Sequence, residues 1–191
     1  AKQAFKFGAD SITIHLREDR RHIKDIDVKK LTKTVIPINL EIAANNEMLK
    51  IALRYKPNFV CLVPENRKEI TTEGGINILK NYNIIQKIIT KLNDKKIRTS
   101  LFINPNYKDI KLSHSIGSKC IELHTGRISD LIKSKKKYSF ELQKIKKCAN
   151  YAKLLGLEIH AGHGMDYKTA KILSKIKEIK EYNIGHFIIG E

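Results

Sequence analysis

The segment Ser11-Ile12-Thr13-Ile14 is followed directly by His15-Leu16-Arg17-Glu18-Asp19-Arg20-Arg21-His22. The first four residues are typical of a short strand, and seven of the next eight side chains are ionisable. Enzymes built on parallel strands place their acid, base and phosphate-binding groups at strand ends of this kind. The segment therefore predicts a parallel sheet whose strand ends carry chemistry.

The same pattern recurs along the whole chain. Short runs of β-branched or apolar residues occur at 11–16, 37–42, 59–64, 98–103, 120–125, 157–162 and 181–186. Segments with helical spacing of apolar residues lie between them, most clearly at 45–55, 78–92 and 140–155. Alternation of strands and helices predicts βαβ units and a parallel sheet covered by helices.

Two parallel architectures compete, an open doubly wound sheet and a closed barrel. An open sheet concentrates its chemistry at one switch point, whereas a barrel collects it from many strands. Nearly every predicted strand ends in reactive groups, which are His15, Arg17, Glu41, Glu65, Glu122, His124, His163 and His186. No Gly-x-Gly-x-x-Gly motif follows the first strand, which weakens a dinucleotide-binding fold. We predict a single TIM (β/α)₈-barrel domain over residues 1–191.

A closed barrel of this class needs eight strands, and only seven runs are visible. Residues 1–7 are typical of the last turns of a helix closed by Gly8, so a strand is expected before them. Residues 187–191 stop where the last helix is expected to begin. We therefore expect an α/β barrel that is truncated, lacking its first strand and its last helix.

Composition limits the other classes of function. The net charge is +17, but the lysines are scattered and no aromatic platform is interleaved with them, so a nucleic-acid-binding module is an alternative rather than the main prediction. The three cysteines are odd in number and lack CxxC spacing, which predicts reduced, buried thiols. No apolar run has membrane-spanning length and no secretory signal is visible, so we expect a cytoplasmic protein without a membrane partner.

Glycine and histidine occur together after the last two predicted strands, in Ala161-Gly162-His163-Gly164 and Asn183-Ile184-Gly185-His186. Barrels commonly bind phosphate in these two loops, where glycine lets the backbone approach an anion. The alternative is that these glycines are ordinary turn residues. Residues 71–75 form another polar, glycine-containing loop, which either folds over a ligand or is a plain solvent loop.

Glu41 and Glu122 each lie inside an otherwise apolar run. Burial of a carboxylate raises its pKa toward neutrality, which suits a general base, although a structural ion pair is the alternative for each. His124 and His160 are expected to be structural. None of the predicted strands contains an internal lysine, so an aldolase that forms an imine on the enzyme is not expected. A metal site is not indicated either, because no His-x-His or His-x-x-x-His pair lies at a strand end.

Seven motifs in this order resemble the pyridoxine 5′-phosphate synthase family. They are His-Leu-Arg-Glu-Asp-Arg-Arg-His-Ile at 15–23, Asn-Leu-Glu at 39–41, Leu-Val-Pro-Glu at 62–65, Thr-Thr-Glu-Gly-Gly at 71–75, Glu-Leu-His-Thr-Gly-Arg at 122–127, Ala-Gly-His-Gly at 161–164 and Asn-Ile-Gly-His at 183–186. The resemblance implies a barrel that condenses 1-deoxy-D-xylulose 5-phosphate with 3-amino-2-oxopropyl phosphate to pyridoxine 5′-phosphate, releasing inorganic phosphate and water. It implies neither metal nor cofactor, and a homo-octamer.

The resemblance also implies roles for individual residues. His15 and Glu41 match the family's proton acceptors, His163 its proton donor, and Glu122 a residue that stabilises the transition state. The matches to substrate-binding residues are Arg17, His22 and Thr71 for the deoxyxylulose phosphate, and Gly164, Gly185 and His186 for the amino-oxopropyl phosphate.

The chain departs from the family pattern in two places. The family's first strand, with its Asn, Asp and His groups and the arginine that follows, has no counterpart, and His160 stands where Asn is common. A different phosphosugar-binding barrel with lyase or isomerase activity is the alternative enzyme, although it needs a lysine or metal that the strands do not show.

Overall fold

The computed structural model describes residues 1–65 and 74–190. Its strands form one sheet in the order β1 to β7, and every neighbouring pair is parallel. The strands are β1 (Ile12–His15), β2 (Ile38–Ala43), β3 (Phe59–Val63), β4 (Arg98–Ile103), β5 (Cys120–His124), β6 (Glu158–Gly162) and β7 (Ile179–Asn183). The predicted parallel sheet is confirmed.

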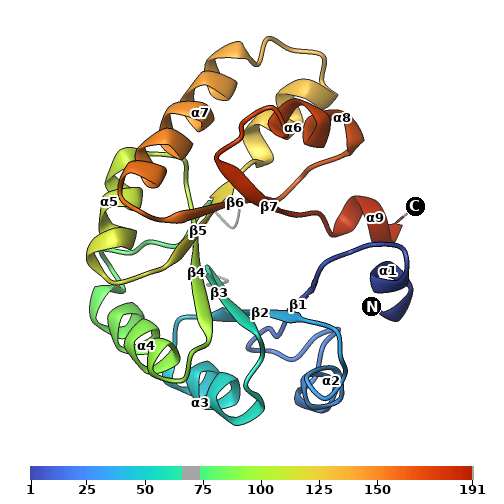
Figure 1. Ribbon diagram of the computed structural model, residues 1–191, viewed down its shortest axis with the longest axis vertical. Coiled ribbons are helices and arrows are strands. Elements are labelled where there is room, and N and C mark those ends of the chain that lie inside the picture. Colours follow the sequence, from blue (N-terminus) through green and yellow to red (C-terminus); the bar gives the residue numbers. More distant parts are fainter. Residues whose placement is uncertain (66–73, 191) are drawn as a thin grey trace.

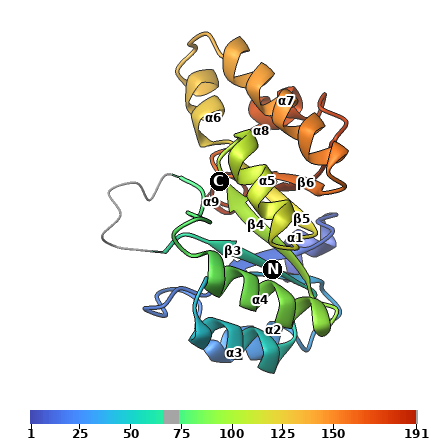
Figure 2. The same cartoon turned by 90° about the vertical axis from the view of Figure 1, so that its left-hand side faces the viewer.

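The sheet is curled, and the helices lie around its outside (Figure 1). They are α1 (Lys2–Lys6), α2 (Asp25–Leu31), α3 (Asn46–Tyr55), α4 (Tyr82–Asp94), α5 (Tyr107–Ser115), α6 (Gly126–Lys133), α7 (Ser139–Leu154), α8 (Tyr167–Leu173) and α9 (His186–Gly190). The same layering is visible from the side in Figure 2. Within the part of the chain that is described, β1 and β7 are the two edges of the sheet, and the Thr13 hydroxyl on β1 donates to Asn183 Oδ1 on β7 at 3.0 Å.

The first six predicted strands agree with the structure to within a residue or two, but the last one was wrong. It was expected at 181–186, whereas β7 covers Ile179–Asn183 and His186 begins α9. The buried Ile179 pairs with Ile159, and a register shift follows at Ile159/His160. Lys180 therefore lies within a strand, contrary to the prediction that the strands lack lysine, although its side chain is exposed.

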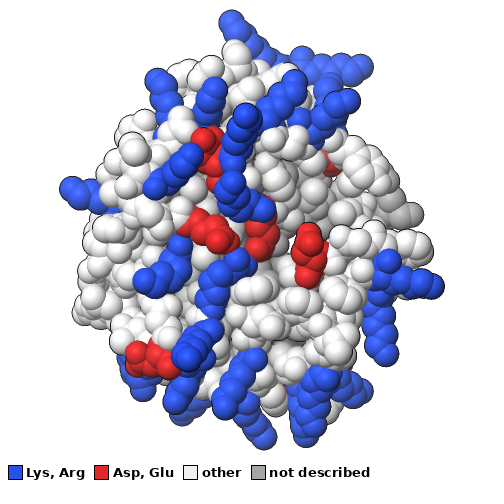
Figure 3. All heavy atoms as spheres, viewed as in Figure 1, with Lys and Arg blue, Asp and Glu red and all other residues white. Residues whose placement is uncertain are grey.

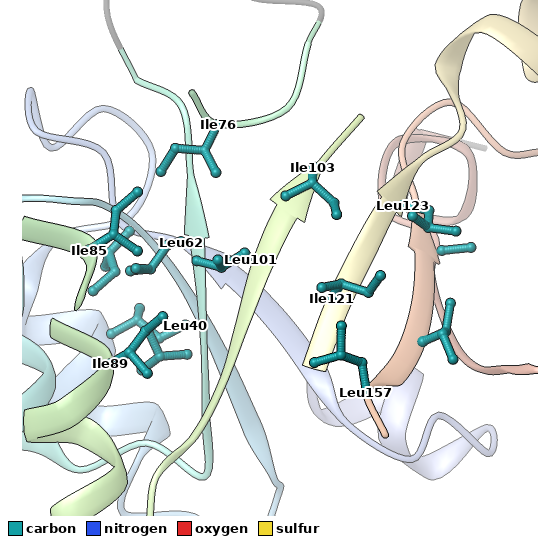
Figure 4. Packing of buried hydrophobic residues seen from close by; sticks show 14 of the residues in the cluster. Leu40, Leu62, Ile76, Ile85, Ile89, Leu101, Ile103, Ile121, Leu123 and Leu157 are labelled. Atoms are coloured by element: carbon teal, nitrogen blue, oxygen red, sulfur yellow. The ribbon is translucent and has the colours of Figure 1, made fainter. Parts of the chain in front are cut away.

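The main hydrophobic core lies between the sheet and the helices rather than inside the curl. Figure 4 shows Leu40, Leu62 and Leu101 from three successive strands beside Ile85 and Ile89 of α4, and all five are buried. Burying side chains of this size stabilises the fold by roughly 1.5–3 kcal/mol each. Along each strand, the residues that alternate with the outward-facing ones point into the curl, and many of them are polar. These include Thr13, His15, Asn39, Glu41, Ser100, Glu122, His160 and Asn183.

Side-chain caps fix where three of the outer helices begin. Asn45 accepts a hydrogen bond from the Met48 backbone N–H, Asn106 from that of Asp109, and Asp166 from that of Thr169. Each cap satisfies a helix N–H that has no partner within the helix. The loops after β2, β4 and β6, the last of which carries His163, are thereby held at the end that enters the helix.

One end of the curl's interior contains a cluster of charges around Arg98. Its guanidinium donates to Glu158 at 2.6 Å and to Glu181 at 2.7 Å, and it lies over the Phe59 ring with 4.0 Å from Cζ to the ring centroid. His160, which is buried, lies 2.8 Å from Glu158 through Nε2. The expected structural role of His160 agrees with this position.

Removing Arg98 should destabilise the protein, because it leaves two carboxylates facing each other with no counter-charge. We expect Arg98→Met to lower the free energy of unfolding by about 2 kcal/mol, less than for a fully buried pair because these side chains are partly exposed. The further changes Glu158→Gln and Glu181→Gln should recover most of the loss. Urea denaturation measures both effects, and a single variant as stable as the parent would contradict the assigned role.

Candidate active site

His15 and Glu41 face each other across the first two strands. The register pairs them directly, at the ends of β1 and in β2, and both side chains point into the curl. The distance from His15 Nδ1 to Glu41 Oε2 is 3.8 Å, and each side chain is about three-quarters buried. The two predicted proton acceptors therefore form one acid–base pair.

Burial shifts the pKa values of this pair in opposite directions. Loss of solvation, followed by the charge of Arg17, lowers the pKa of His15 to about 4. Loss of solvation raises the pKa of Glu41 to about 7. At neutral pH the His15 imidazole is therefore neutral and can accept a proton. The Glu41 carboxyl group, with its pKa near 7, can both accept and release one.

Glu122 lies deep in the curl on β5 and is fully buried. Its Oε2 accepts a hydrogen bond from Asn183 Nδ2 at 2.8 Å and faces the Cys61 thiol at 3.8 Å. A Cβ added at Gly162 on β6 would come within 1.7 Å of Glu122 Oε1, so only glycine leaves room for the carboxyl group. These contacts are made with neutral groups, and among residues 1–65 and 74–190 no arginine forms an ion pair with Glu122.

Burial, then the charges of Glu41 and Glu181, raises the pKa of Glu122 to about 8. Burial also raises the pKa of the Cys61 thiol, with further increases from Glu122 and Glu41. The thiol is therefore protonated and able to donate to Glu122. Two carboxyl groups with pKa values near neutrality share one interior, which is an arrangement suited to proton transfer.

His163 follows β6 in a left-handed backbone conformation, with φ of 80°. Gly164 is also left-handed, with φ of 77°, and Lys133 of α6 donates to its carbonyl oxygen at 2.7 Å. The Thr125 hydroxyl lies 2.7 Å from the Gly162 carbonyl and 2.8 Å from that of His163. A non-glycine residue held with positive φ is strained, and such strain is commonly found at functional sites.

His124 was expected to be structural, but it lies within the site and stacks on His163. The ring centroids are 4.8 Å apart with an interplanar angle of 28°, and Phe102 meets His124 edge-on at 5.2 Å. Burial, followed by the charge of His163, lowers the pKa of His124 to about 4. A Cβ at Gly126 would come within 2.8 Å of the His124 ring. Its place at the end of a predicted strand was the signal that pointed to the site.

The loop after β1 owes its shape to Arg20, a left-handed residue with φ of 56°. Its guanidinium donates to the Glu18 carbonyl at 2.8 Å and forms ion pairs with Asp25 and Glu47. Arg21 pairs with Asp19 at 2.6 Å. Ion pairs of Asp19, Arg20 and Arg21 therefore support this loop.

Other predicted substrate-binding residues lie at the margins. Arg17 is half-buried in the same loop, close to His15, whereas His22, Gly185 and His186 are exposed. Among residues 1–65 and 74–190, no hydrogen bond or ion pair joins these last three to the predicted catalytic residues. Thr71 lies outside the described residues, so the structure does not place it.

One group of potential metal ligands occurs within the described chain, formed by Cys120, Glu158 and His160. It lies beside the Arg98 cluster. Arg98 and His160 already share the Glu158 oxygen, so a resident guanidinium supplies the positive charge there. This group therefore carries no argument for a metal in the reaction.

The basic residues do not form one patch on the face that Figure 3 shows. Lys and Arg side chains lie along the top and bottom of this face and through its middle, where several carboxylates lie among them. A nucleic-acid module would instead gather its lysines on one surface. None of the described helices is long and apolar enough to cross a membrane.

Comparison with known proteins assigns the chain to a family. The family model described as "Pyridoxal phosphate biosynthesis protein PdxJ" matches residues 1–191. The chain belongs to this family. The prediction of a vitamin B6 biosynthetic enzyme is thereby confirmed.

Several PdxJ relatives are similar over nearly the whole chain. One from Pelagibacter ubique, named pyridoxine 5′-phosphate synthase, is 62% identical over 192 residues, covering 100% of this chain and 80% of the relative. One of the same name from Blochmanniella pennsylvanica is 50% identical over 184 residues, covering 96% and 75%. Among solved structures, a 3-hexulose-6-phosphate synthase has a TM-score of 0.61 at 10% identity, covering 96% of this chain and 81% of its own. That likeness concerns the fold alone, and it confirms the predicted barrel architecture.

The raised pKa of Glu122 predicts how stability depends on pH in this PdxJ protein. The protonated carboxyl group is favoured by folding, so its contribution is complete below the ordinary value of 4.5 and is lost as the pH rises through about 8. We expect Glu122→Gln to gain at least about 1 kcal/mol in free energy of unfolding, relative to the parent, between about pH 5 and pH 9.

Urea denaturation at several pH values measures this gain, with Asp94→Asn as the control because Asp94 is an exposed carboxylate at the end of α4. The lowered pKa values of His15 and His124 also make stability depend on pH, but they are common to the parent and both variants and so cancel in the comparison. If the difference in free energy of unfolding between the Glu122→Gln variant and the parent stays constant over this pH range, Glu122 ionises normally and the prediction is wrong.

Proposed function

We propose that this chain condenses 1-deoxy-D-xylulose 5-phosphate with 3-amino-2-oxopropyl phosphate, forming pyridoxine 5′-phosphate and releasing inorganic phosphate and water. The observation that carries the proposal is the His15–Glu41 pair, 3.8 Å apart, in which burial lowers the pKa of His15 to about 4 and raises that of Glu41 to about 7. Membership of the PdxJ family supports it, and the chain is an enzyme of pyridoxine biosynthesis.

The reaction suits a site whose main groups are histidines and carboxyl groups. The amino-oxopropyl substrate brings its own amine, so the imine forms between the two substrates and the enzyme moves protons and holds phosphates. In this proposal His15 and Glu41 accept protons, and His163 donates one. Glu122 stabilises charge that develops in the transition state, for which its protonated carboxyl group can donate a hydrogen bond.

Substrate phosphates are proposed to bind at both sides of the acid–base pair. Arg17, His22 and Thr71 would hold the deoxyxylulose phosphate, where the planar guanidinium of Arg17 matches the phosphate oxygens. Gly164, Gly185 and His186 would hold the amino-oxopropyl phosphate. A single domain over residues 1–191, a homo-octamer and a cytoplasmic location stay predictions, and light scattering tests the octamer.

The test is direct. The full-length protein is supplied with both phosphate substrates, and pyridoxine 5′-phosphate is followed together with released inorganic phosphate. Equal amounts of both products are expected. Folded protein that yields neither product would overturn the proposal.

Single substitutions test the acid–base pair. We expect His15→Asn and Glu41→Gln each to lower kcat by roughly 100-fold or more, because each removes a group that transfers protons, while the fold is kept. Steady-state kinetics measure the loss, and circular dichroism checks the fold. His114→Asn on the exposed side of α5 is the control and should behave as the parent. Unchanged turnover in either variant would remove that residue from the mechanism.

A further inference from the structure

Glu65 has no role in the function proposed above, yet it lies close to His15 and Arg17, which do. It follows β3, and its side chain is only 5% exposed. Its Oε1 accepts the Glu18 backbone N–H at 2.6 Å and lies 3.8 Å from Arg17 Nε. Its Oε2 lies 4.0 Å from His15 Nε2. Glu65 therefore joins the end of β3 to His15 at the end of β1 and to Arg17 in the loop after it.

Three buried polar atoms meet at this point without hydrogen-bond partners in the described chain. They are His15 Nε2, Arg17 Nε and Glu65 Oε2. Buried polar atoms are nearly always paired, so a group of three in one place requires an explanation. The two nitrogens can donate and the carboxylate oxygen can accept, and small side-chain rotations would close both gaps to hydrogen bonds.

The His15 ring consequently lies between two carboxyl groups. Its Nδ1 faces Glu41 at 3.8 Å, and its Nε2 faces Glu65 at 4.0 Å. A neutral imidazole carries one proton and one lone pair, so the nitrogen that keeps the proton decides which one can act as a base.

We propose that Glu65 is a positioning residue that holds the proton of neutral His15 on Nε2 and so leaves Nδ1, beside Glu41, as the proton acceptor. This inference rests on the proposed function, because it takes His15 as a base in that reaction. It gives Glu65 the task that a buried carboxylate performs for the histidine of a catalytic triad.

The charges around Glu65 are compatible with this task. Arg17, Glu18 and Asp19 face it from the loop after β1, and His15 faces it from β1, with Glu41 behind the ring. Burial, together with the charges of Glu18 and Asp19, raises the pKa of Glu65, while the Glu18 N–H and the Arg17 guanidinium act against the rise. Both opposing groups favour the carboxylate, which is the form that accepts the Nε2 proton.

Glu65→Gln tests the proposal because its geometry determines how the amide must sit. The Glu18 N–H needs an acceptor, so the amide oxygen takes the place of Oε1 and the amide NH₂ takes the place of Oε2. That NH₂ would then donate to His15 Nε2 and drive the proton to Nδ1. Glu65→Asp keeps the charge and should keep the proton on Nε2.

The measurement is ¹⁵N NMR of protein labelled at histidine, with the His15 signals assigned by their loss in His15→Asn. The parent and Glu65→Asp should show the proton on Nε2, and Glu65→Gln should show it on Nδ1. In the assay Glu65→Gln should lose about 10-fold or more in kcat, with a smaller change in KM. Asp94→Asn, which changes an exposed carboxylate at the end of α4 and outside the site, should match the parent in both measurements.

A parent protein with the His15 proton on Nδ1 would overturn the inference, and so would a Glu65→Gln variant with unchanged tautomer or with kcat within twofold of the parent. The parent spectrum decides the matter even if Glu65→Gln fails to fold. Because the NMR signal needs no substrate, it is separate from the proposed function, whose failure would appear as an inactive parent.

Discussion

The structure depends on the removal of Glu41 and Glu122 from water. An ionised carboxylate is costly to bury, and the rise of the two pKa values to about 7 and about 8 lowers that cost because it populates the neutral form. Cys61 and Asn183 supply neutral hydrogen-bond donors, and Gly162 leaves space for the Glu122 carboxyl group. The outcome is a polar interior in which Glu41 and Glu122 have pKa values near neutrality.

This interior is possible because the hydrophobic core lies elsewhere. Leu40, Leu62 and Leu101 pack outward against the helices, so stability comes from the outer layer of the barrel and the inner face of the sheet is free to carry polar groups (Figure 4). At one end of the curl Arg98 balances Glu158 and Glu181, while the other end collects His15, Glu41 and His163. The condensation proposed for this PdxJ protein would use such a desolvated interior beside the loops proposed to hold the substrate phosphates.

Much of this arrangement is visible in the sequence. The alternation of strands and helices predicted the parallel sheet, because periodicity reports directly on which face is buried. Glu41 and Glu122 stood out as carboxylates in apolar runs. The last strand was misplaced by two to three residues, since its boundary depends on the register with Ile159, which no local pattern reveals. The stacking of His124 on His163 and the contact between Glu65 and His15 join different strands, so they could be found only in three dimensions.

Burial brings both interior carboxyl groups to neutral pKa values, and the chemistry of the site depends on this shift. The most direct measurement is a pH titration of the side-chain ¹³C carboxyl signals of labelled protein, with Glu41 and Glu122 assigned by their Gln variants. We predict that the pair titrates with apparent pKa values between about 7 and about 8. Titration of both groups near their ordinary value of 4.5 would contradict this origin of the site's chemistry.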